Sequence, residues 1–174
     1  MSKSRAKLQK GLASEKSIQS AQKALSLIHL PPEKIDCLVH VSVTRDCLEP
    51  ATACMVHSGL GLKPHAMNFD ISNACLGFLN GFFTVADMIE LGHIERGLIV
   101  GTEMSSPLIQ ATIEKILKKV NIGLDEAQEY LPSLTLGSGS AAIILAHDSV
   151  STTEHKFLGG VAQSAEKFML CCAD

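Results

Sequence analysis

One cysteine, Cys75, stands where a thiol can act as a nucleophile. Its surroundings, residues 70–78 with the sequence DISNACLGF, predict a short strand, a turn of small residues and a long apolar helix that starts at the cysteine. A thiol at a helix N-terminus lies beside unpaired backbone N–H groups and the positive end of the helix dipole, and both stabilise a thiolate. Such a thiolate is the nucleophile of covalent catalysis. The pattern also leaves open a buried, unreactive cysteine.

Several glycines accompany this cysteine. Gly77 allows neighbouring backbone to come close, and Gly81 allows another element to pack against the helix. Gly137 and Gly139 belong to a Gly/Ser loop that lacks a lysine and precedes a strand, which argues against a phosphate-binding P-loop. We expect this loop to make a tight turn near the nucleophile.

Three further polar residues have structural interpretations. Glu49 precedes Pro50, where an exposed carboxylate is favourable at a helix N-terminus. Glu103 follows an apolar strand. It is either a structural hydrogen-bond acceptor or part of a dimer contact. His40 lies inside an expected strand, where a hydrogen-bonded core histidine is the default and most other histidines are expected at the surface.

The six cysteines and seven histidines show no metal-ligand spacing, so we expect no metal site. The cysteines also form no compact disulfide framework, and the adjacent pair Cys171 and Cys172 lies near the end of the chain. Free thiols in a reducing compartment are therefore expected.

Composition excludes several classes of protein. The 174 residues are 46% hydrophobic and 19% charged, which is typical of a globular chain rather than a disordered one. A net charge of -3 without a basic stripe argues against a nucleic-acid partner. No apolar run reaches the roughly 18 to 20 residues of a membrane span, and the polar N-terminus lacks the apolar core of a secretory signal. We expect a cytoplasmic protein.

Apolar spacing predicts helices that alternate with strands, which indicates an α/β layered fold with a mostly parallel sheet. The helix at Cys75 is apolar nearly all round, which predicts that it is buried. Residues 1–13 are expected to be a tail or linker, and residues 14–174 one domain. The expected helices are 14–29, 50–59, the helix from Cys75 to Gly92, 107–120 and 124–130; the expected strands are 36–43, 66–71, 96–101, the strand entered through residues 134–146, and 156–164.

The segment DISNACLGFLNGFFTVADMIELGHIERGLIVGTE resembles the active-site region of the β-ketoacyl-acyl-carrier-protein synthase III group of the thiolase superfamily. LTLGSGSAAIILA is similar to the Gly-rich loop and last strand of that family's first half, and the likeness extends over about residues 14–165. SVTRDCLEPATA together with SNACLGF resembles the subgroup that condenses two acyl-CoA chains head to head in olefin biosynthesis.

The resemblance implies a truncated N-terminal half domain of the thiolase-like fold, with a mixed, mostly parallel five-stranded sheet. The family's opening strand has no counterpart in residues 1–13. We expect that strand in the middle of the sheet, so its loss would leave a gap with unpaired backbone groups.

The resemblance also implies an acyltransferase of lipid metabolism. Cys75 would be the acylated nucleophile, and Glu49 would reach across a dimer as the base that deprotonates a second acyl chain. The substrates would be acyl-CoA or acyl-carrier-protein thioesters, with no cofactor. A homodimer, or a separate chain that supplies the C-terminal half, would complete a site that lacks the family's histidine and asparagine.

Two alternatives stay open. The chain is a non-catalytic remnant that acts as a dimerisation or binding partner, or it is part of a decarboxylating, malonyl-dependent 3-oxoacyl synthase III. A cysteine hydrolase is disfavoured, because no histidine near Cys75 has the spacing of a base.

Overall fold

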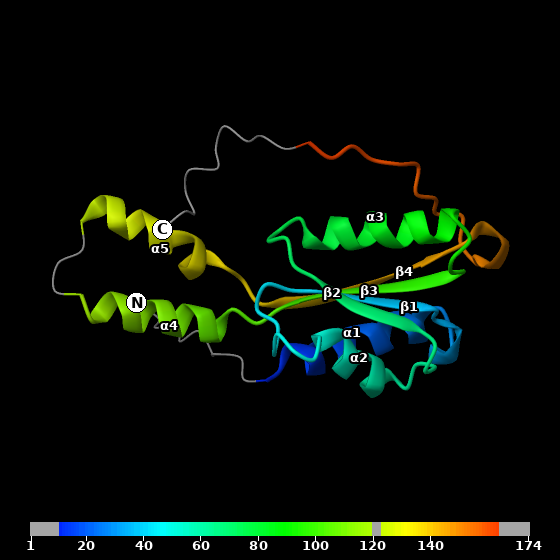
Figure 1. The fold of residues 1–174 in the computed structure, drawn as a ribbon, viewed down its shortest axis with the longest axis horizontal. Coiled ribbons are helices and arrows are strands. Elements are labelled where there is room, and N and C mark those ends of the chain that lie inside the picture. The colour runs from blue at the N-terminus through cyan, green and yellow to red at the C-terminus, as the bar shows by residue number, and fades with distance from the viewer. Residues whose placement is uncertain (1–10, 120–122, 164–174) are drawn as a thin grey trace, which may run out of the picture.

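The computed structural model describes residues 11–119 and 123–163 (Figure 1). Helices alternate with strands, which confirms the predicted α/β class. The elements in chain order are α1 (Ala13–Leu27), a 3-10 turn at Pro32–Lys34, β1 (Cys37–Val41), α2 (Thr52–Leu60), β2 (Met67–Ile71), α3 (Gly77–Glu90), β3 (Arg96–Glu103), α4 (Ser106–Leu117), α5 (Leu124–Thr135), β4 (Gly139–Ala146) and a second 3-10 turn at Asp148–Val150.

The described residues form one sheet of four strands, in the order β2-β1-β3-β4. β1, β2 and β3 are parallel, and β4 is antiparallel to β3, so the predicted mixed, mostly parallel sheet is confirmed. The expected gap in the middle of the sheet is wrong. Val39 of β1 pairs with Phe69 on one side and Ile99 on the other, so the sheet is continuous and a further strand has room only at an edge.

The expected strand over residues 156–164 is also not formed, and the described residues contain four strands. Residue 164 lies outside the described part, and residues 156–163 carry no strand. They run along α3 instead (Figure 1). Phe157 packs edge-on against Phe82 and Phe83 of α3, with ring centroids 4.8 and 5.5 Å apart. Because this segment lies over a helix, it has no strand to pair with.

Helices cover the two faces of the sheet unequally. α1 and α2 lie on one face, and α3 lies alone on the other (Figure 1). Each face has its own apolar cluster: Ala21, Leu25, Ile35, Leu38, Val56, Leu60, Leu62, Ala66, Leu98 and Val100 under α1 and α2, and Cys37, Val39, Val41, Val85, Ile89, Ile94 and Ile99 under α3.

α3 is buried on one side only, so the prediction of a helix buried all round is wrong for this chain. Gly77, Gly81, Val85 and Ile89 face the sheet, whereas Leu79 is 53% exposed. The predicted role of Gly81 is confirmed, whereas the close neighbour of Gly77 is a side chain and not the backbone that was expected. A Cβ on Gly77 would lie 2.7 Å from a methyl group of Val41, and a Cβ on Gly81 would lie 3.3 Å from methyl groups of Val41 and Ile99.

The predicted boundaries differ by a few residues. α1 begins at Ala13, and α5 continues to Thr135. Residues 1–10 of the predicted tail lie outside the described part. Among the helices of residues 11–119 and 123–163, none has the length and apolar character that crossing a bilayer requires.

Candidate active site

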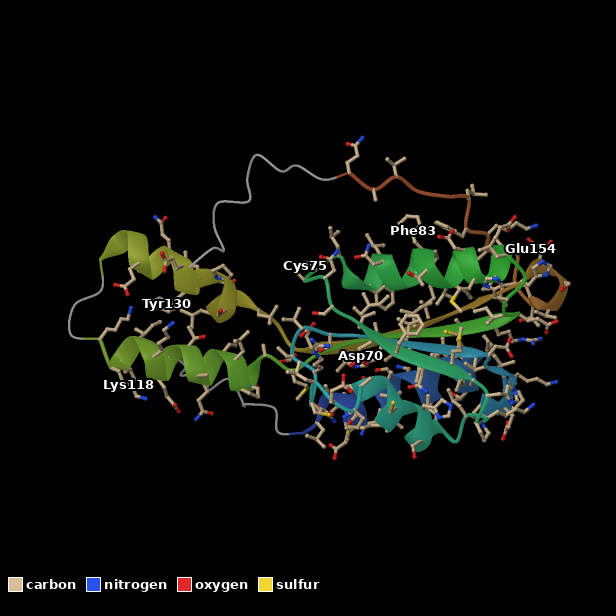
Figure 2. All side chains as sticks on the ribbon, in the orientation of Figure 1. Asp70, Cys75, Phe83, Lys118, Tyr130 and Glu154 are labelled. Atoms are coloured by element: carbon tan, nitrogen blue, oxygen red, sulfur yellow. The ribbon has the colours of Figure 1, made fainter. Side chains whose placement is uncertain are left out.

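The residues predicted to do chemistry gather at one end of the sheet. We call this end, where β1, β2 and β3 finish and β4 begins, the site edge. Cys75 follows β2, the loop with Glu49 follows β1, and Glu103 at the end of β3 pairs with Gly139 at the start of β4. Figure 2 shows Cys75 at the start of α3, at the end from which α4 and α5 project. The loops after parallel strands therefore converge here, as is typical of ligand sites in α/β folds.

Cys75 lies two residues before the first residue of α3, and its side chain is exposed. Ala74 adopts a positive φ of 42°, and the turn closes through the N–H of Leu76, which donates to the carbonyl of Asn73 at 3.0 Å. The alternative of a buried cysteine, which the sequence left open, is therefore wrong for Cys75. This thiol stands next to the first turn of α3, whose backbone N–H groups have no partner inside the helix.

Cys37 provides the contrast. It is fully buried in β1, and burial together with the charge of Asp36 raises the pKa of its thiol to about 11. A thiol of this kind stays protonated and packs as a small apolar group. All four described cysteines, Cys37, Cys47, Cys54 and Cys75, are free, and Cys171 and Cys172 lie outside the described residues.

Glu49 is exposed in the loop between β1 and α2, followed by a cis peptide bond to Pro50. Its loop starts beside the strand that leads to Cys75, because Val41 pairs with Ile71. Among the described residues no hydrogen bond or ion pair joins the Glu49 and Cys75 side chains. The structure therefore brings the two candidates to one edge without direct contact.

Three carboxylates hold the loop of Glu49 in place, and the sequence analysis gave no such role to two of them, Asp46 and Asp70. Asp46 accepts from the N–H groups of Ala13 and Ser14 at 2.6 and 2.9 Å, and so ties the loop to the start of α1. Asp70 accepts from the N–H groups of Thr52 and Ala53 at 2.9 and 2.8 Å at the start of α2. Negative charge at a helix N-terminus is favourable, because the backbone N–H groups there have no partner inside the helix.

Glu103 is the third of these carboxylates. It accepts from the N–H of Val43 at 2.7 Å, and from the N–H and hydroxyl of Thr44 at 3.1 and 2.6 Å. Thr44 in turn accepts from the N–H of Met104 at 2.7 Å. The first interpretation of Glu103, a structural acceptor, is thereby confirmed.

His40 lies fully buried beneath this loop, in register with Asp70 on the neighbouring strand. Its Nδ1 is 3.4 Å from the Asp70 carboxylate, and neither ring nitrogen has a hydrogen-bond partner of good geometry among the described residues. The prediction of a core histidine is confirmed, but its polar atoms are not satisfied as expected. Burial lowers the pKa of His40, and the nearby carboxylates of Asp70, Asp46 and Glu103 only oppose that effect.

A chain of hydroxyl groups crosses the same region. Ser17 of α1 and Thr102 of β3 lie 2.7 Å apart, and Thr102 lies 2.7 Å from Ser140 of β4. These contacts fix the start of β4 against α1. Nothing in the described residues lies within 4 Å of a Cβ placed on Gly137 or Gly139, and neither has a positive φ. The prediction that the loop of Gly137 and Gly139 packs tightly is therefore wrong within the described residues.

Among the described residues, no three His, Cys, Asp or Glu side chains converge to hold a metal ion. The site edge offers an exposed thiol at a helix start and a carboxylate on the loop after the neighbouring strand, which polar contacts fix. These are the parts needed for acyl transfer to sulfur and for proton removal.

The layered sheet with a cysteine between β2 and α3 defines a class, the thiolase-like fold. Residues 69–165, more than half of the chain, match the family described as 3-Oxoacyl-[acyl-carrier-protein (ACP)] synthase III, and the chain belongs to this family.

Two relatives are acyl-CoA:acyl-CoA alkyltransferases. The chain is 38% identical to that of Xanthomonas campestris over 92% of its own length and 47% of the relative's. It is 35% identical to that of Shewanella oneidensis over 91% and 46%. A beta-ketoacyl-[acyl-carrier-protein] synthase III of Koribacter versatilis is 36% identical over 58% of this chain and 30% of that protein.

Solved structures agree with these relatives. Acetamide-bound Xanthomonas campestris OleA superposes with a TM-score of 0.85 at 38% identity, over 92% of this chain and 49% of that one. A cysteine-to-serine variant of OleA with bound lauric acid and lauroyl-CoA gives a TM-score of 0.82 at 36% identity, over 91% and 47%. The chain spans about half the length of the curated relatives it matches and corresponds to their N-terminal half.

Proposed function

We propose that this chain carries the acyl-accepting half of a condensing acyltransferase, in which Cys75 forms an acyl thioester and a Claisen condensation gives a β-keto product. The observation that carries the proposal is the exposed Cys75 at the start of α3, in a chain 38% identical to an acyl-CoA:acyl-CoA alkyltransferase. The proposed substrates are acyl-CoA or acyl-carrier-protein thioesters, and the chemistry needs no cofactor.

The first step is acyl transfer. The Cys75 thiolate attacks the carbonyl carbon of the acyl thioester, the carbon–sulfur bond to CoA or the carrier breaks, and the CoA or carrier thiolate leaves. The exposed position of the thiol supports this step, because a carrier thioester must reach it from solvent.

The second step needs a base. We propose that Glu49 removes a proton from the α-carbon of a second acyl thioester, so that the resulting carbanion attacks the acyl group on Cys75 and expels the thiolate. Glu49 would do this across a dimer, at the site of a partner chain. Support comes from its loop, which Asp46, Asp70 and Glu103 tie to three different elements. A base on a fixed loop loses less entropy in reaching the reacting atom.

The site as described lacks a donor that stabilises the negative charge on the carbonyl oxygens. We propose that a second half, in a separate chain or in the remainder of a longer one, supplies the histidine and asparagine for this task. Removal of one such donor costs about 3–4 kcal/mol of transition-state stabilisation, so the described half alone should acylate but not turn over.

A chimera tests the condensation. Residues 11–163 replace the matched part of the Xanthomonas campestris enzyme, and the β-keto product from lauroyl-CoA is measured by mass spectrometry. We expect product from the chimera and none from its Cys75→Ala variant. Glu49→Gln should lower the rate of product formation by about 100-fold or more. Glu33→Gln, an exposed glutamate away from the site edge, is the matched control and should leave the rate unchanged. Product formation by Cys75→Ala would contradict the proposal.

Two other candidates have distinct outcomes. Decarboxylating condensation would give product from malonyl thioester with release of carbon dioxide, and Glu49→Gln would not slow it.

The second candidate is a non-catalytic binding partner. One observation favours it: the outer side of α3 is apolar and only half covered, and Leu79 there is 53% exposed. A folded chimera without any acyl adduct would support that role.

A further inference from the structure

The turn that carries Cys75 holds one residue in a strained conformation. Ala74 has a φ of 42°, in the left-handed region that side chains with a Cβ disfavour. His29, the other described non-glycine residue with a positive φ, directly follows the C-cap of α1, where this conformation is ordinary. Ala74 instead precedes a helix. Contacts around the turn must therefore hold it in this conformation.

Two backbone hydrogen bonds close the turn from within. The N–H of Leu76 donates to the carbonyl of Asn73 at 3.0 Å, and the N–H of Gly77 donates to the carbonyl of Ala74 at 3.2 Å. Each joins residues that are three apart, and neither reaches beyond the first residue of α3. They close the turn, but they do not fix it against the body of the helix.

One side-chain contact makes that link. Nδ2 of Asn73 donates to Oδ1 of Asn80 at 2.6 Å, so the contact spans seven residues and encloses Cys75 between its ends. We call Asn73 and Asn80 the asparagine pair. The backbone N–H of Asn80 donates to the carbonyl of Leu76 at 2.9 Å, so Asn80 belongs to the regular hydrogen-bonded part of α3. Among the described residues, no other side-chain hydrogen bond joins residues 72–76 to α3.

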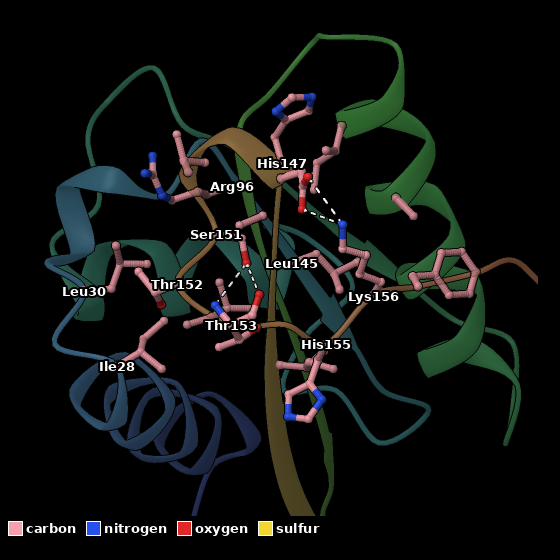
Figure 3. A pocket seen from close by; sticks show the side chains of 18 of the residues that line it. Ile28, Leu30, Arg96, Leu145, His147, Ser151, Thr152, Thr153, His155 and Lys156 are labelled. Atoms are coloured by element: carbon pink, nitrogen blue, oxygen red, sulfur yellow. Dashed lines mark hydrogen bonds and ion pairs between the residues drawn. The ribbon is translucent and has the colours of Figure 1, made fainter.

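Asn80 is a firm anchor, because the backbone of α3 lies directly against the sheet there. Its neighbour Gly81 is buried, and a Cβ on Gly81 would lie 3.3 Å from a methyl group of Ile99. A cavity of about 810 Å³ borders α3 only farther along, from Phe82 onward (Figure 3). A hydrogen bond to Asn80 therefore ties the turn to a closely packed part of the molecule.

We propose that Asn80 is a positioning residue for the nucleophile: through Asn73 it holds the strained turn and so fixes the direction in which Cys75 presents its thiol. The inference rests on the function proposed for Cys75 and deepens it. Attack on a thioester needs the sulfur and the carbonyl carbon in close and aligned contact, and a small displacement lowers the rate strongly. Because the asparagine pair orders the turn before a substrate arrives, the reaction step does not have to order it.

Amide hydrogen exchange tests whether the turn is held. Asn80→Leu keeps the branched shape and removes the acceptor, whereas Asn80→Asp keeps an acceptor oxygen. By NMR on the full chain, exchange at Leu76 and Gly77 should be about fivefold faster in Asn80→Leu, the effect of one lost hydrogen bond, and should return to the wild-type rate in Asn80→Asp. Asn73→Ala, which removes the donor from the exposed turn, should act like Asn80→Leu.

Acylation by lauroyl-CoA tests the consequence for the thiol. Intact-protein mass spectrometry follows the rate as the lauroyl-CoA concentration increases. Asn80→Leu should lower the saturating rate about tenfold or more at an unchanged half-saturating concentration, because the thiol is displaced and the binding surface is not. Asn80→Asp should recover most of the rate. Asn68→Leu is the matched control and should acylate like the wild type, because Asn68 accepts from Cys54 and no described hydrogen bond joins it to the turn.

Three results would overturn the proposal. Unchanged exchange in folded Asn80→Leu and Asn73→Ala would show that the asparagine pair does not hold the turn. Faster exchange with unchanged acylation would show that the thiol does not depend on the turn. Equal losses in Asn80→Asp and Asn80→Leu would assign the effect to packing rather than to the acceptor. A wild type that is not acylated would instead contradict the function proposed for Cys75, and exchange would still decide whether Asn80 holds the turn.

Discussion

The two faces of the sheet differ in how many helices of this chain cover them. On one face α1 and α2 enclose a cluster in which Leu38, Leu98 and Val56 are fully buried. On the other face α3 stands alone, and Phe69, Ile71, Phe78, Ile143 and Leu145 are only partly buried. Both faces contain fully buried strand residues, such as Leu98 and Ile99, but more of the side chains packed around the cluster under α3 are only partly buried.

This difference separates two tasks. The closed face holds the polar contacts that fix the loop of Glu49, since Asp46 caps α1 and Asp70 caps α2. The open face carries α3, and with it Cys75. The chain spans about half the length of the relatives it matches, and in our account further polypeptide covers the open face. The face that two helices cover thus positions the candidate base, Glu49. The face that one helix covers presents the candidate nucleophile, Cys75.

The largest change in the free energy of unfolding is expected for one of two leucines on neighbouring strands. Leu98 of β3 is fully buried on the closed face, and Leu145 of β4 is half-buried on the open face. Leu98→Ala should lower the free energy of unfolding by about 3–5 kcal/mol, because it leaves a cavity in a packed core. Leu145→Ala should cost about 1 kcal/mol, since less apolar area is buried. Urea denaturation measures both, and equal losses would contradict the different burial of the two leucines.

A smaller effect is expected where α3 meets the sheet. A Cβ on Gly77 would lie 2.7 Å from Val41, so Gly77→Ala should cost about 1–3 kcal/mol of unfolding free energy by forcing α3 outward. Gly137→Ala is the control, because nothing lies within 4 Å of its Cβ, and it should change stability by less than about 0.5 kcal/mol. Thermal unfolding followed by circular dichroism compares the two. A neutral Gly77→Ala would show that α3 is loosely seated.

The smallest effect is a pH dependence from the closed face. Burial lowers the pKa of His40 below its ordinary value of 6.5. The unfolded chain therefore binds a proton at His40 as the pH falls below about 6.5, while the folded chain resists it. Stability is then lost as the pH falls through that window, by at most about 1.4 kcal/mol per pH unit for one site.

Urea denaturation between pH 7.5 and 5 measures this slope, and His40→Gln should flatten it. His93→Gln, which changes an exposed histidine, is the control and should keep the slope of the wild type. A slope that survives in His40→Gln would assign the pH dependence to other groups.

Local sequence patterns predicted much of the fold and the position of Cys75. The turn of small residues before α3 was visible in DISNACLGF, and Gly77 and Gly81 were recognised as points of close approach. Such features depend on neighbours in the sequence, so periodicity and turn residues reveal them.

Long-range features were missed, because they depend on which strands are neighbours. The gap expected between strands was wrong since β1 pairs directly with β3, and the strand expected over residues 156–164 was wrong since that segment packs on Phe82 and Phe83. The role of Asp46 was not visible for the same reason. Its partners Ala13 and Ser14 lie more than thirty residues away in the sequence, at the start of α1.

Acylation of Cys75 is the most direct test of the central claim. The full chain is incubated with lauroyl-CoA and analysed by intact-protein mass spectrometry, followed by peptide mapping. Cys54→Ala is the matched control, because Cys54 is another exposed thiol. We predict one lauroyl adduct per chain, on the peptide that contains Cys75, in the wild type and in Cys54→Ala, and none in Cys75→Ala. A folded wild type without an adduct, or an adduct that persists in Cys75→Ala, would contradict the account.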